Sequence, residues 1–365
     1  MSLLTLLPID YILGMGAWLA FLVVAVWGLL GWRRSRRLAK RSLRGPHFGL
    51  AIWMMLATFT APEVLCSLFY DATDSFSQTN VSRRWFDRHV QVNRAGYRDG
   101  HELPTVREAG HQYVAFIGDS FTFGHGVRNV ADRFSDRVGF ALADEGVVAS
   151  NIALPGLEIR QLVDKLLPEL EQQQVPIDVL VYTFVPNDIE YCDERTAAFY
   201  QKLAGCEPRL FLWKQTYFYN LLYHRLAYLS DSGRGDYYGY LTGSYAGAPW
   251  QRFAAKLDQL HNWCRQHNVQ LQVVIFPFLT SLGSDDPFAP AYATLSEYCR
   301  TESIPCLDLT PTLTEHRREG LVVSRFDAHP NAKAHALAAE AILPVVRQHL
   351  TLPRSERLPS ATRTK

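Results

Sequence analysis

Two long apolar stretches near the N-terminus, separated by a basic run, constrain this chain more than any other feature. Residues 11–31 (YILGMGAWLAFLVVAVWGLLG) contain no charged side chain. At about 1.5 Å per residue they are long enough to cross the hydrocarbon core of a bilayer. A second apolar stretch covers about residues 48–70 and is interrupted by Pro62 and Glu63. We therefore expect residues 1–71 to form a membrane anchor with two transmembrane helices.

The segment between the two apolar stretches predicts the side of the membrane on which the rest of the chain lies. Residues 33–44 read RRSRRLAKRSLR, and a short loop so rich in Lys and Arg stays cytoplasmic. The N-terminus and everything after residue 70 should then lie on the periplasmic or extracellular side. A cleaved signal peptide is the alternative, but no charged leader precedes the first stretch and no small-residue cleavage site follows it.

Glu63 is the one charged residue of the second apolar stretch. An ionisable residue within a membrane span often marks a functional site. Glu63 directly follows Pro62, however, in a stretch that is equally consistent with a kinked helix near the interface. We favour a structural role for it.

Beyond the anchor, the composition is that of a globular protein. The 365 residues are 48% hydrophobic and 20% charged, which suffices for one full α/β domain plus an appended segment. The formal charge of +1, with no basic stripe outside the N-terminal run, argues against nucleic acid as a partner. We divide the chain after the anchor into a connector at 72–112, a domain at 113–352 and a polar tail at 353–365.

Short apolar runs rich in β-branched residues alternate with amphipathic stretches from residue 113 onward. Continuous apolar runs are typical of parallel strands buried on both faces. The alternation predicts a doubly wound, flavodoxin-like α/β sheet with helices on both faces, in which ligands bind beyond the carboxyl ends of the strands. The predicted strands are residues 113–117, 147–152, 178–184, 271–276 and a weaker 304–309, and the predicted helices are 129–145, 158–172, 250–267 and 330–350.

An aromatic-rich insertion interrupts this alternation at about residues 200–250. It could cover a site, form part of a substrate cleft or rest on a lipid surface, whereas the simplest alternative is a helical cap packed on the core. We favour the cap. Its aromatic residues are Phe211, Trp213, Tyr217, Phe218, Tyr219, Tyr223, Tyr228, Tyr237, Tyr238, Tyr240 and Tyr245.

Five of the six cysteines follow the anchor, where an oxidising compartment would permit disulfides. Proximity in sequence suggests two pairs, Cys192 with Cys206 and Cys299 with Cys306, while Cys264 has no near neighbour. No spacing matches a zinc site, so we expect no structural metal.

Ser120 lies in the run YVAFIGDSFTFGHGV, directly after the strongest predicted strand and where a helix should begin. A serine at such a turn has its hydroxyl raised above the sheet, near backbone N–H groups that can face a developing oxyanion. We expect Gly118 to permit the tight turn. The tripeptide alone is weak, since Asp and Ser also serve as turn and N-cap residues.

A base for this serine occurs near the C-terminus, in SRFDAHPNAKAHALAAEAI. We expect Asp327 and His329 to lie in a loop before a helix that Pro330 starts. Such a histidine could take the serine proton while the carboxylate fixes its tautomer and stabilises the imidazolium. The alternative is a solvent-exposed histidine in an ordinary loop.

Two more polar positions follow predicted strands in the same order along the chain. Gly156 lies in NIALPGLEIRQ and Asn187 in FVPNDIEY. The backbone N–H of Gly156 and the side-chain amide of Asn187 could join the N–H of Ser120 as oxyanion donors. Each alone could be a turn residue, but their joint placement favours a site.

Other titratable residues near these motifs compete for roles. His125 is expected beside the cleft, where it could contact substrate, and His335 falls inside the last predicted helix. Neither has a neighbouring acid in a comparable motif. Asp119 and Asp188 are expected to hold their loops.

These residues resemble the SGNH hydrolases, also called the GDSL lipase/esterase superfamily, in its membrane-tethered bacterial form. Four blocks match in family order over about residues 114–350: GDSFTFG, NIALPG, VPND and DAHPN. The resemblance implies Ser120 as nucleophile and oxyanion donor, Gly156 and Asn187 as oxyanion donors, His329 as general base and Asp327 as its orienting acid. It also implies that no metal or organic cofactor is needed.

Two departures from the family pattern stand out. The usual spacing is Asp-x-x-His, whereas Asp327 lies two residues before His329, with Phe326 in the usual acid position. The third block reads Val-Pro-Asn-Asp in place of Gly-x-Asn-Asp, which removes a flexible residue beside Asn187.

The prediction is therefore an extracytoplasmic, membrane-anchored serine esterase or acylhydrolase, acting on O-acyl, in particular acetyl, groups of envelope glycans or lipids. Its partners would be the membrane and the envelope-polysaccharide machinery. The alternatives are an O-acetyltransferase for an exported polysaccharide and a noncatalytic glycan-binding envelope protein with the same fold.

Overall fold

The computed structural model describes residues 7–205, 207–230 and 237–351, which form two compact units. A helical unit comprises residues 1–88 and 206–231, and an α/β unit comprises residues 89–205 and 232–365. The predicted connector at 72–112 is thus divided between the two units. The predicted polar tail at 353–365 and Cys206, with its suggested pairing to Cys192, lie outside the described residues.

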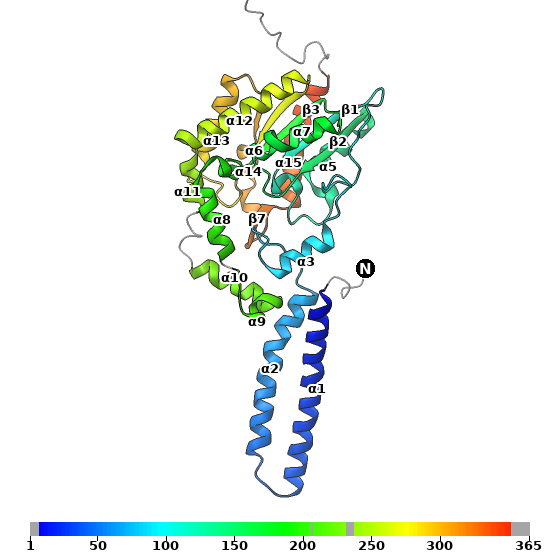
Figure 1. The fold of residues 1–365 in the computed structure, drawn as a ribbon, viewed down its shortest axis with the longest axis vertical. Helices are drawn as coiled ribbons and strands as arrows, with labels where there is room; N and C mark the ends of the chain where they lie inside the picture. Colours follow the sequence, from blue (N-terminus) through cyan, green and yellow to red (C-terminus); the bar gives the residue numbers. More distant parts are fainter. Residues whose placement is uncertain (1–6, 206, 231–236, 352–365) are drawn as a thin grey trace, which may run out of the picture. The chain divides into compact units, whose positions relative to one another are not determined.

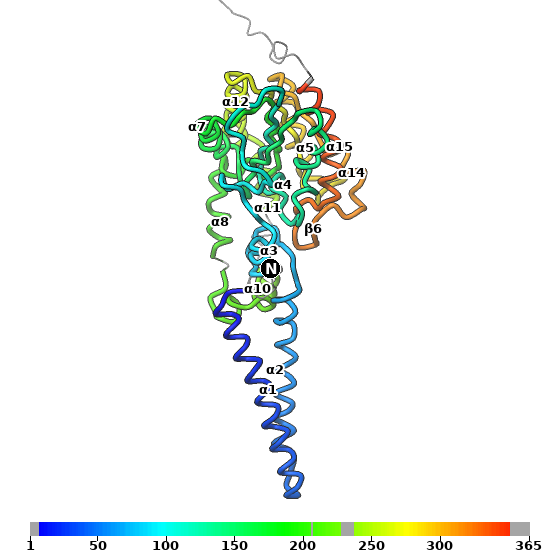
Figure 2. The backbone as a smooth tube through the Cα atoms, turned by 90° about the vertical axis from the view of Figure 1, so that its right-hand side faces the viewer, coloured from blue at the N-terminus to red at the C-terminus, as the bar shows by residue number. Residues whose placement is uncertain are grey.

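The helical unit begins with two long apolar helices, α1 (Ile9–Leu38) and α2 (Arg44–Leu68) (Figures 1 and 2). Both are long and apolar enough to cross a membrane, as the sequence predicts. They form a hairpin in which the Trp53 indole donates to the Leu22 carbonyl (2.7 Å) and the Trp18 indole to the Thr60 hydroxyl (2.9 Å). The helix α2 continues through Pro62.

Glu63 joins this hairpin to shorter helices of the same unit. These are α3 (Asn80–His89), α9 (Phe211–Gln215) and α10 (Phe218–Ser230). The Glu63 carboxylate accepts the backbone N–H groups of Tyr217 (2.8 Å) and Phe218 (2.7 Å) at the start of α10. The first N–H groups of a helix have no partner within it, so a carboxylate there stabilises the helix. The bonds support the structural role predicted for Glu63.

Arg84 of α3 caps the C-terminal end of α2, as Glu63 caps the start of α10. Its buried guanidinium donates to the carbonyls of Cys66 (2.9 Å), Ser67 and Tyr70 (2.6 Å) and lies 4.6 Å from the Tyr217 ring centroid. The last carbonyls of a helix need such partners. Burial lowers the pKa of Arg84 below its usual value.

The α/β unit is built on a parallel five-stranded sheet of order β2-β1-β3-β4-β5, of which Figure 1 labels β1, β2 and β3. This is the order of flavodoxin-like, doubly wound folds, so the predicted fold class is confirmed. The last residue of β1, Gly118, pairs with Ala153 of β2 and Thr183 of β3, so these three strands end side by side. The strands are β1 (Gln112–Gly118), β2 (Val147–Ala153), β3 (Val179–Phe184), β4 (Gln270–Ile275) and β5 (Cys306–Asp308).

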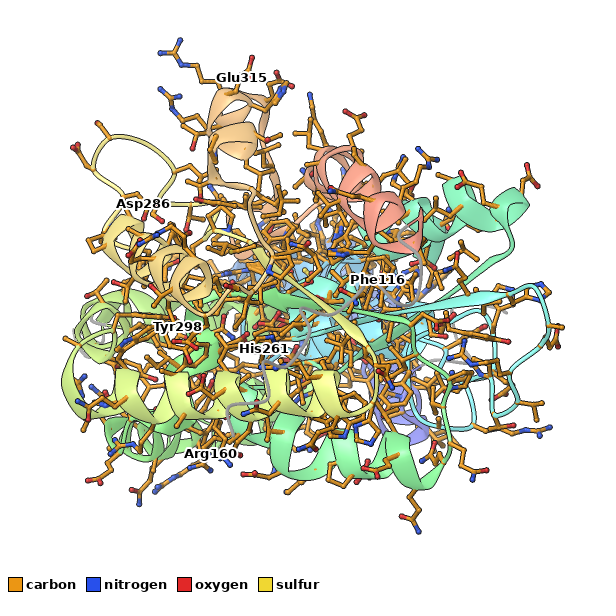
Figure 3. The ribbon with its side chains drawn as sticks, turned by 90° about the horizontal axis from the view of Figure 1, so that it is seen from above. Phe116, Arg160, His261, Asp286, Tyr298 and Glu315 are labelled. Atoms are coloured by element: carbon orange, nitrogen blue, oxygen red, sulfur yellow. The ribbon has the colours of Figure 1, made fainter. Side chains whose placement is uncertain are left out.

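Helices cover both faces of this sheet and bury its apolar side chains. Phe116 of β1 lies at the centre of the unit, whereas Arg160 and Glu315 lie at its periphery (Figure 3). The helices α5 and α15 pack together. The covering elements are α5 (Phe134–Leu142), α6 (Ile159–Gln161), the π-helical η4 (Leu162–Leu166), α7 (Leu167–Gln172), α12 (Gly247–Gln266), α13 (Ala289–Thr301), α14 (Thr310–Glu315) and α15 (Ala332–Thr351), with 3₁₀ turns η2 (Val130–Asp132), η3 (Ala143–Glu145) and η6 (Arg317–Glu319).

A small antiparallel hairpin precedes α15. Its strands are β6 (Val322–Ser324) and β7 (Asp327–Pro330). The expectation of a loop here, with Pro330 starting the helix, is therefore wrong. Pro330 ends β7 opposite Val322, and Asn331 caps the helix instead, because its side-chain oxygen accepts the N–H groups of Lys333 and Ala334.

The aromatic insertion divides between the two units. Its α9 and α10 belong to the helical unit, whereas α8 (Arg195–Gly205) and α11 (Tyr237–Ser244) belong to the α/β unit. Tyr245, just after α11, is buried and donates to the Pro186 carbonyl (2.6 Å). Only the part of the insertion that belongs to the α/β unit is the cap on its core that the sequence suggested.

The cysteines of the described residues are free thiols. The suggested disulfide between Cys299 and Cys306 is therefore not formed, and Cys192 and Cys264 are buried.

Candidate active site

Ser120 lies at the switch from the central strand to a helix. The strand β1 ends at Gly118, and the short helix α4 (Ser120–Phe123) begins at Ser120. The Asp119 carboxylate caps this helix by accepting the backbone N–H of Phe121 (2.8 Å). Ser120 is half-buried, whereas Asp119 and Phe121 on either side of it are buried. Ser120 is therefore the accessible residue of this turn.

Gly118 is needed for space. A Cβ at this position would come within 2.4 Å of the Thr122 hydroxyl oxygen and 3.0 Å of the Thr183 carbonyl oxygen. Positive φ is not the reason, because Gly118 is not among the residues that adopt it. Gly118 is therefore required because β1, α4 and β3 approach one another closely at this position, and not for a tight turn as expected.

The structure brings Ser120, His329 and Asp327 together in one chain of contacts. The Ser120 Oγ lies 2.8 Å from His329 Nε2, and His329 Nδ1 lies 2.6 Å from Asp327 Oδ1. The same Asp327 oxygen accepts the backbone N–H of His329 (3.1 Å). These are the distances and the order of partners that a nucleophile, its base and an orienting acid require.

The short Asp-x-His spacing follows from the local secondary structure. Asp327 and His329 both lie on β7. Alternate residues of a strand share one face, so residues two apart can point the same way. On a strand, the two-residue spacing therefore brings the carboxylate and the imidazole together, as a three-residue spacing does in a turn or helix.

Two aromatic neighbours fix the His329 ring. The His125 ring stacks on it at 3.9 Å with an interplanar angle of 11°, and Phe121 of α4 meets it edge-on at 5.5 Å. His125 is buried, with its Nε2 at 3.6 Å from Asp327 Oδ2. His125 therefore packs against His329 and Asp327, and its expected place beside a substrate cleft stays a prediction.

His125, Asp327 and His329 also present ligand atoms within 4.8 Å of one another, a spacing that could hold a metal ion. Both ring nitrogens of His329 are, however, within hydrogen-bond distance of protein atoms, one at Asp327 and the other at Ser120. The arrangement fits proton transfer better than metal ligation.

The two remaining predicted site residues follow the neighbouring strands. Asn187 lies in the 3₁₀ segment η5 (Pro186–Cys192) after β3, and its amide donates to Asp119 Oδ2 (2.9 Å). An amide nitrogen carries two hydrogens, so a second N–H remains for another acceptor. Gly156 lies in the exposed loop after β2 with a φ of 76°, a conformation that favours glycine.

A comparison of the whole sequence with known families agrees with this geometry. The profile of the GDSL-like lipase/acylhydrolase family matches residues 116–337, more than half of the chain. The chain belongs to the GDSL-like lipase/acylhydrolase family. It is a serine ester hydrolase of the GDSL type.

Solved structures similar to this GDSL hydrolase are distant from it. A two-domain esterase active on acetylated mannans is 15% identical over 69% of this chain and 52% of its own length, with a TM-score of 0.38, so the chain spans about half of that protein. A G-D-S-L family protein from Veillonella parvula is 15% identical over 65% and 99% (TM-score 0.38), and an acetyl xylan esterase is 13% identical over 64% and 99% (TM-score 0.41). No curated protein matches the sequence.

Asp119 and Asp188 hold the loops of the GDSL site, as expected. Asp119 bonds α4 and Asn187, and Asp188 accepts the Tyr182 hydroxyl (2.7 Å) and the backbone N–H of Val185 (3.4 Å). Burial raises the pKa of both carboxyls above the usual value, and for Asp188 the charge of Asp119 adds to this effect.

The GDSL domain also uses two buried arginines that the motif search missed. Arg98, in the predicted connector, donates to the carbonyls of Gly124 (2.7 Å) and Val127 (2.6 Å), just after α4. Arg133 contacts the same region through Phe123 and binds Asp136 (2.8 Å). Burial lowers the pKa of Arg98 to about 10. A basic residue in a polar connector carries no signal that it will be buried, so only the structure reveals this support.

Glu190 is a second missed residue of the GDSL domain, three residues after Asn187. It is buried and accepts the hydroxyls of Tyr200 (2.6 Å) and Tyr237. Burial raises the pKa of Glu190 to about 7. Glu190 thus ties the Asn187 segment to α8 and α11 of the aromatic insertion.

His335, the other competing histidine, lies away from the triad contacts. It is buried in α15, where its Nδ1 accepts the backbone N–H of Phe134 (3.3 Å) at the start of α5. Burial lowers the pKa of His335 to about 3, which keeps the ring neutral as this contact requires. Its role is to join two helices.

Proposed function

We propose that this protein is a membrane-anchored serine esterase that forms an acyl intermediate on Ser120. The observation that carries the proposal is the unbroken contact from Ser120 Oγ through the His329 ring to Asp327. A hydroxyl is a weak nucleophile at its ordinary pKa and needs an adjacent base that is itself oriented.

In the first half of the reaction, Ser120 Oγ attacks the carbonyl carbon of an ester. His329 Nε2 takes the hydroxyl proton, and Asp327 stabilises the imidazolium that results. When the tetrahedral intermediate collapses, the alcohol oxygen leaves with the proton from His329. The acyl group remains bonded to Ser120.

In the second half, water repeats this chemistry. His329 removes a proton from the water, the hydroxide attacks the acyl carbon, and the proton returns to Ser120 as the carboxylic acid departs. The backbone N–H groups of Ser120 and Gly156 and the free N–H of the Asn187 amide would stabilise the oxyanion in both steps. The bond to Asp119 orients that amide.

We further infer that the substrates are O-acyl, in particular acetyl, esters of envelope glycans or lipids. The support is topological: the basic run at residues 33–44, which covers the end of α1 and the turn into α2, is expected to stay cytoplasmic, which leaves the α/β unit on the outer side. In that position the unit would meet esterified glycans and lipids of the envelope.

The location can be tested with reporters fused to the C-terminus of the full chain. Alkaline phosphatase needs disulfides that form only in an oxidising compartment. It should be active in this fusion, and an inactive fusion beside a bright cytoplasmic fluorescent-protein fusion would place the domain inside.

The esterase itself is tested by Ser120→Ala in the full chain, purified in detergent and assayed on p-nitrophenyl acetate. Loss of the nucleophile should lower kcat by about 10⁴-fold or more. Ser284→Ala, in an exposed loop of the same unit, is the matched control and should retain full activity. Full activity of Ser120→Ala would refute the mechanism.

A further inference from the structure

A large cavity lies within the helical unit, between α1 and α2 on one side and α9 and α10 on the other. Its volume is about 740 Å³, within the range of small-molecule sites. Its walls include Tyr11, Gly14, Trp18, Phe59, Phe211 and Tyr219. Four helices from distant parts of the sequence thus enclose one space.

Two polar residues of these walls, Glu63 and Thr60, are already bonded to protein. Both oxygens of Glu63 accept hydrogen bonds, from Tyr11 and Tyr217 at Oε1 and from Phe218 at Oε2. Thr60 donates to the Leu56 carbonyl (2.8 Å) and accepts from the Trp18 indole. Asp10 and Gln215 also line the cavity, but most of its wall is aromatic and aliphatic, which favours an apolar occupant.

The rim of the cavity continues the apolar outer surface of the two long helices. Phe59 of α2 is 57% exposed and Phe211 of α9 is 79% exposed, and both line the cavity. Leu210, Phe211 and Leu212 form an exposed run, unusual for a surface that faces water. The same bilayer that covers the long helices would therefore meet the opening of the cavity.

We propose that this cavity binds an acyl chain of a bilayer lipid. The inference rests on the membrane anchoring in the proposed function and is independent of the chemistry at Ser120. The segment of α9 and α10 would lie at the membrane interface, held there by Glu63 at the start of α10. Each methylene buried in the cavity should tighten binding about fourfold.

Two glycines of α1 provide a matched pair of variants. Gly14 lines the cavity, whereas Gly16, half a turn further along, is exposed and is not part of its walls. A Cβ added at either position meets no atom within 4 Å, so neither substitution should disturb the helix pair. Gly14→Phe fills the cavity and Gly16→Phe does not.

The full chain would be reconstituted in nanodiscs of dioleoyl phosphatidylglycerol and dioleoyl phosphatidylethanolamine. Native mass spectrometry would then release the protein from the nanodisc in the gas phase and measure the mass of any lipid that stays bound. The wild type and Gly16→Phe should retain one lipid. Gly14→Phe should retain it about fifteenfold less, the loss expected when about two methylenes leave the cavity. Phe211→Ser, on a different helix, should also weaken retention.

Three results would overturn the proposal: a wild type without bound lipid, a Gly14→Phe protein that retains lipid as well as Gly16→Phe does, or added mass that corresponds to a second copy of the chain. Failure of the anchoring is distinguishable, since a chain without membrane spans would not enter the nanodisc. Failure of the esterase is distinguishable too, because p-nitrophenyl acetate hydrolysis is measured on the same preparations.

Discussion

Asp327 in the α/β unit and Glu63 in the helical unit are buried carboxylates with similar bonds and different consequences. They are 0% and 2% exposed. Asp327 accepts the backbone N–H of His329 and contacts its ring, whereas Glu63 accepts two backbone N–H groups and the Tyr11 hydroxyl. The partner of Asp327 is His329, which passes the contact on to the half-buried Ser120. The partners of Glu63 are helix N–H groups and the Tyr11 hydroxyl, and the Tyr11 ring packs edge-on against Tyr217 (5.0 Å), so these contacts stay within the packing of the helical unit. A buried carboxylate therefore predicts chemistry only when its partner leads to an accessible reactive group.

The largest effect that would sharpen this comparison is expected from Asp327→Asn. The amide keeps the shape of the carboxylate but favours the wrong histidine tautomer, so kcat on p-nitrophenyl acetate should fall by about 10⁴-fold. Thermal unfolding, measured on the same protein, should change little. Asp286→Asn, a buried carboxylate of the same unit outside the triad, is the control and should keep its activity. An Asp327→Asn enzyme that stays highly active would contradict the catalytic role given to Asp327 in contrast to Glu63.

Asn187→Ala should have the next largest effect. Removal of one oxyanion donor lowers kcat by about 10²- to 10³-fold and leaves KM for a small ester almost unchanged. The two constants are read from steady-state kinetics. An increase in KM with normal kcat would instead assign Asn187 to ground-state binding.

Glu63→Gln should affect stability and leave activity on a soluble ester intact. Loss of the charge-assisted bonds to Tyr217 and Phe218 should cost about 1.5–3 kcal/mol, the usual value for hydrogen bonds to a charged group. Hydrogen exchange at these two amides should accelerate about tenfold or more. Asp10→Asn, an exposed acid at the start of α1, is the control. Loss of kcat in Glu63→Gln, with normal exchange, would contradict the structural assignment.

Glu190→Gln should produce the smallest effect, on the pH dependence of stability. Burial raises the pKa of Glu190 to about 7, so the folded state binds more protons than the unfolded state between about pH 4.5 and 7. The contribution of Glu190 is fully present below that window and is lost as the pH rises through it.

The variant should reduce the fall in unfolding free energy by up to about 1.4 kcal/mol per pH unit in this window. Denaturant titrations at several pH values measure that slope. An unchanged slope would show that Glu190 stays ionised in its tyrosine contacts.

Much of the α/β unit could be predicted because its determinants are local. Each strand is a short apolar run, and parallel strands place their carboxyl ends at one edge, so Ser120, Gly156 and Asn187 follow β1, β2 and β3. The hairpin under Asp327 and His329 was not predicted, since two strands of three and four residues leave almost no periodic pattern.

The helical unit was predictable only in its two long helices. The bond from Glu63 to Phe218 joins residues 155 apart, and no pattern near either residue announces it. The aromatic insertion likewise divides between two units at a point that composition does not mark. Arg98 and Glu190 became buried because the fold surrounds them, which their own sequence neighbourhood does not encode.

The central claim, that Ser120 is the nucleophile activated through His329, is tested most directly by covalent labelling. The full chain in detergent would be treated with a fluorophosphonate and digested, and the modified peptide identified by mass spectrometry. We expect one adduct, on Ser120, that disappears in Ser120→Ala and is strongly slowed in His329→Ala. A folded protein that stays unlabelled, or that carries the adduct on another residue, would contradict the account.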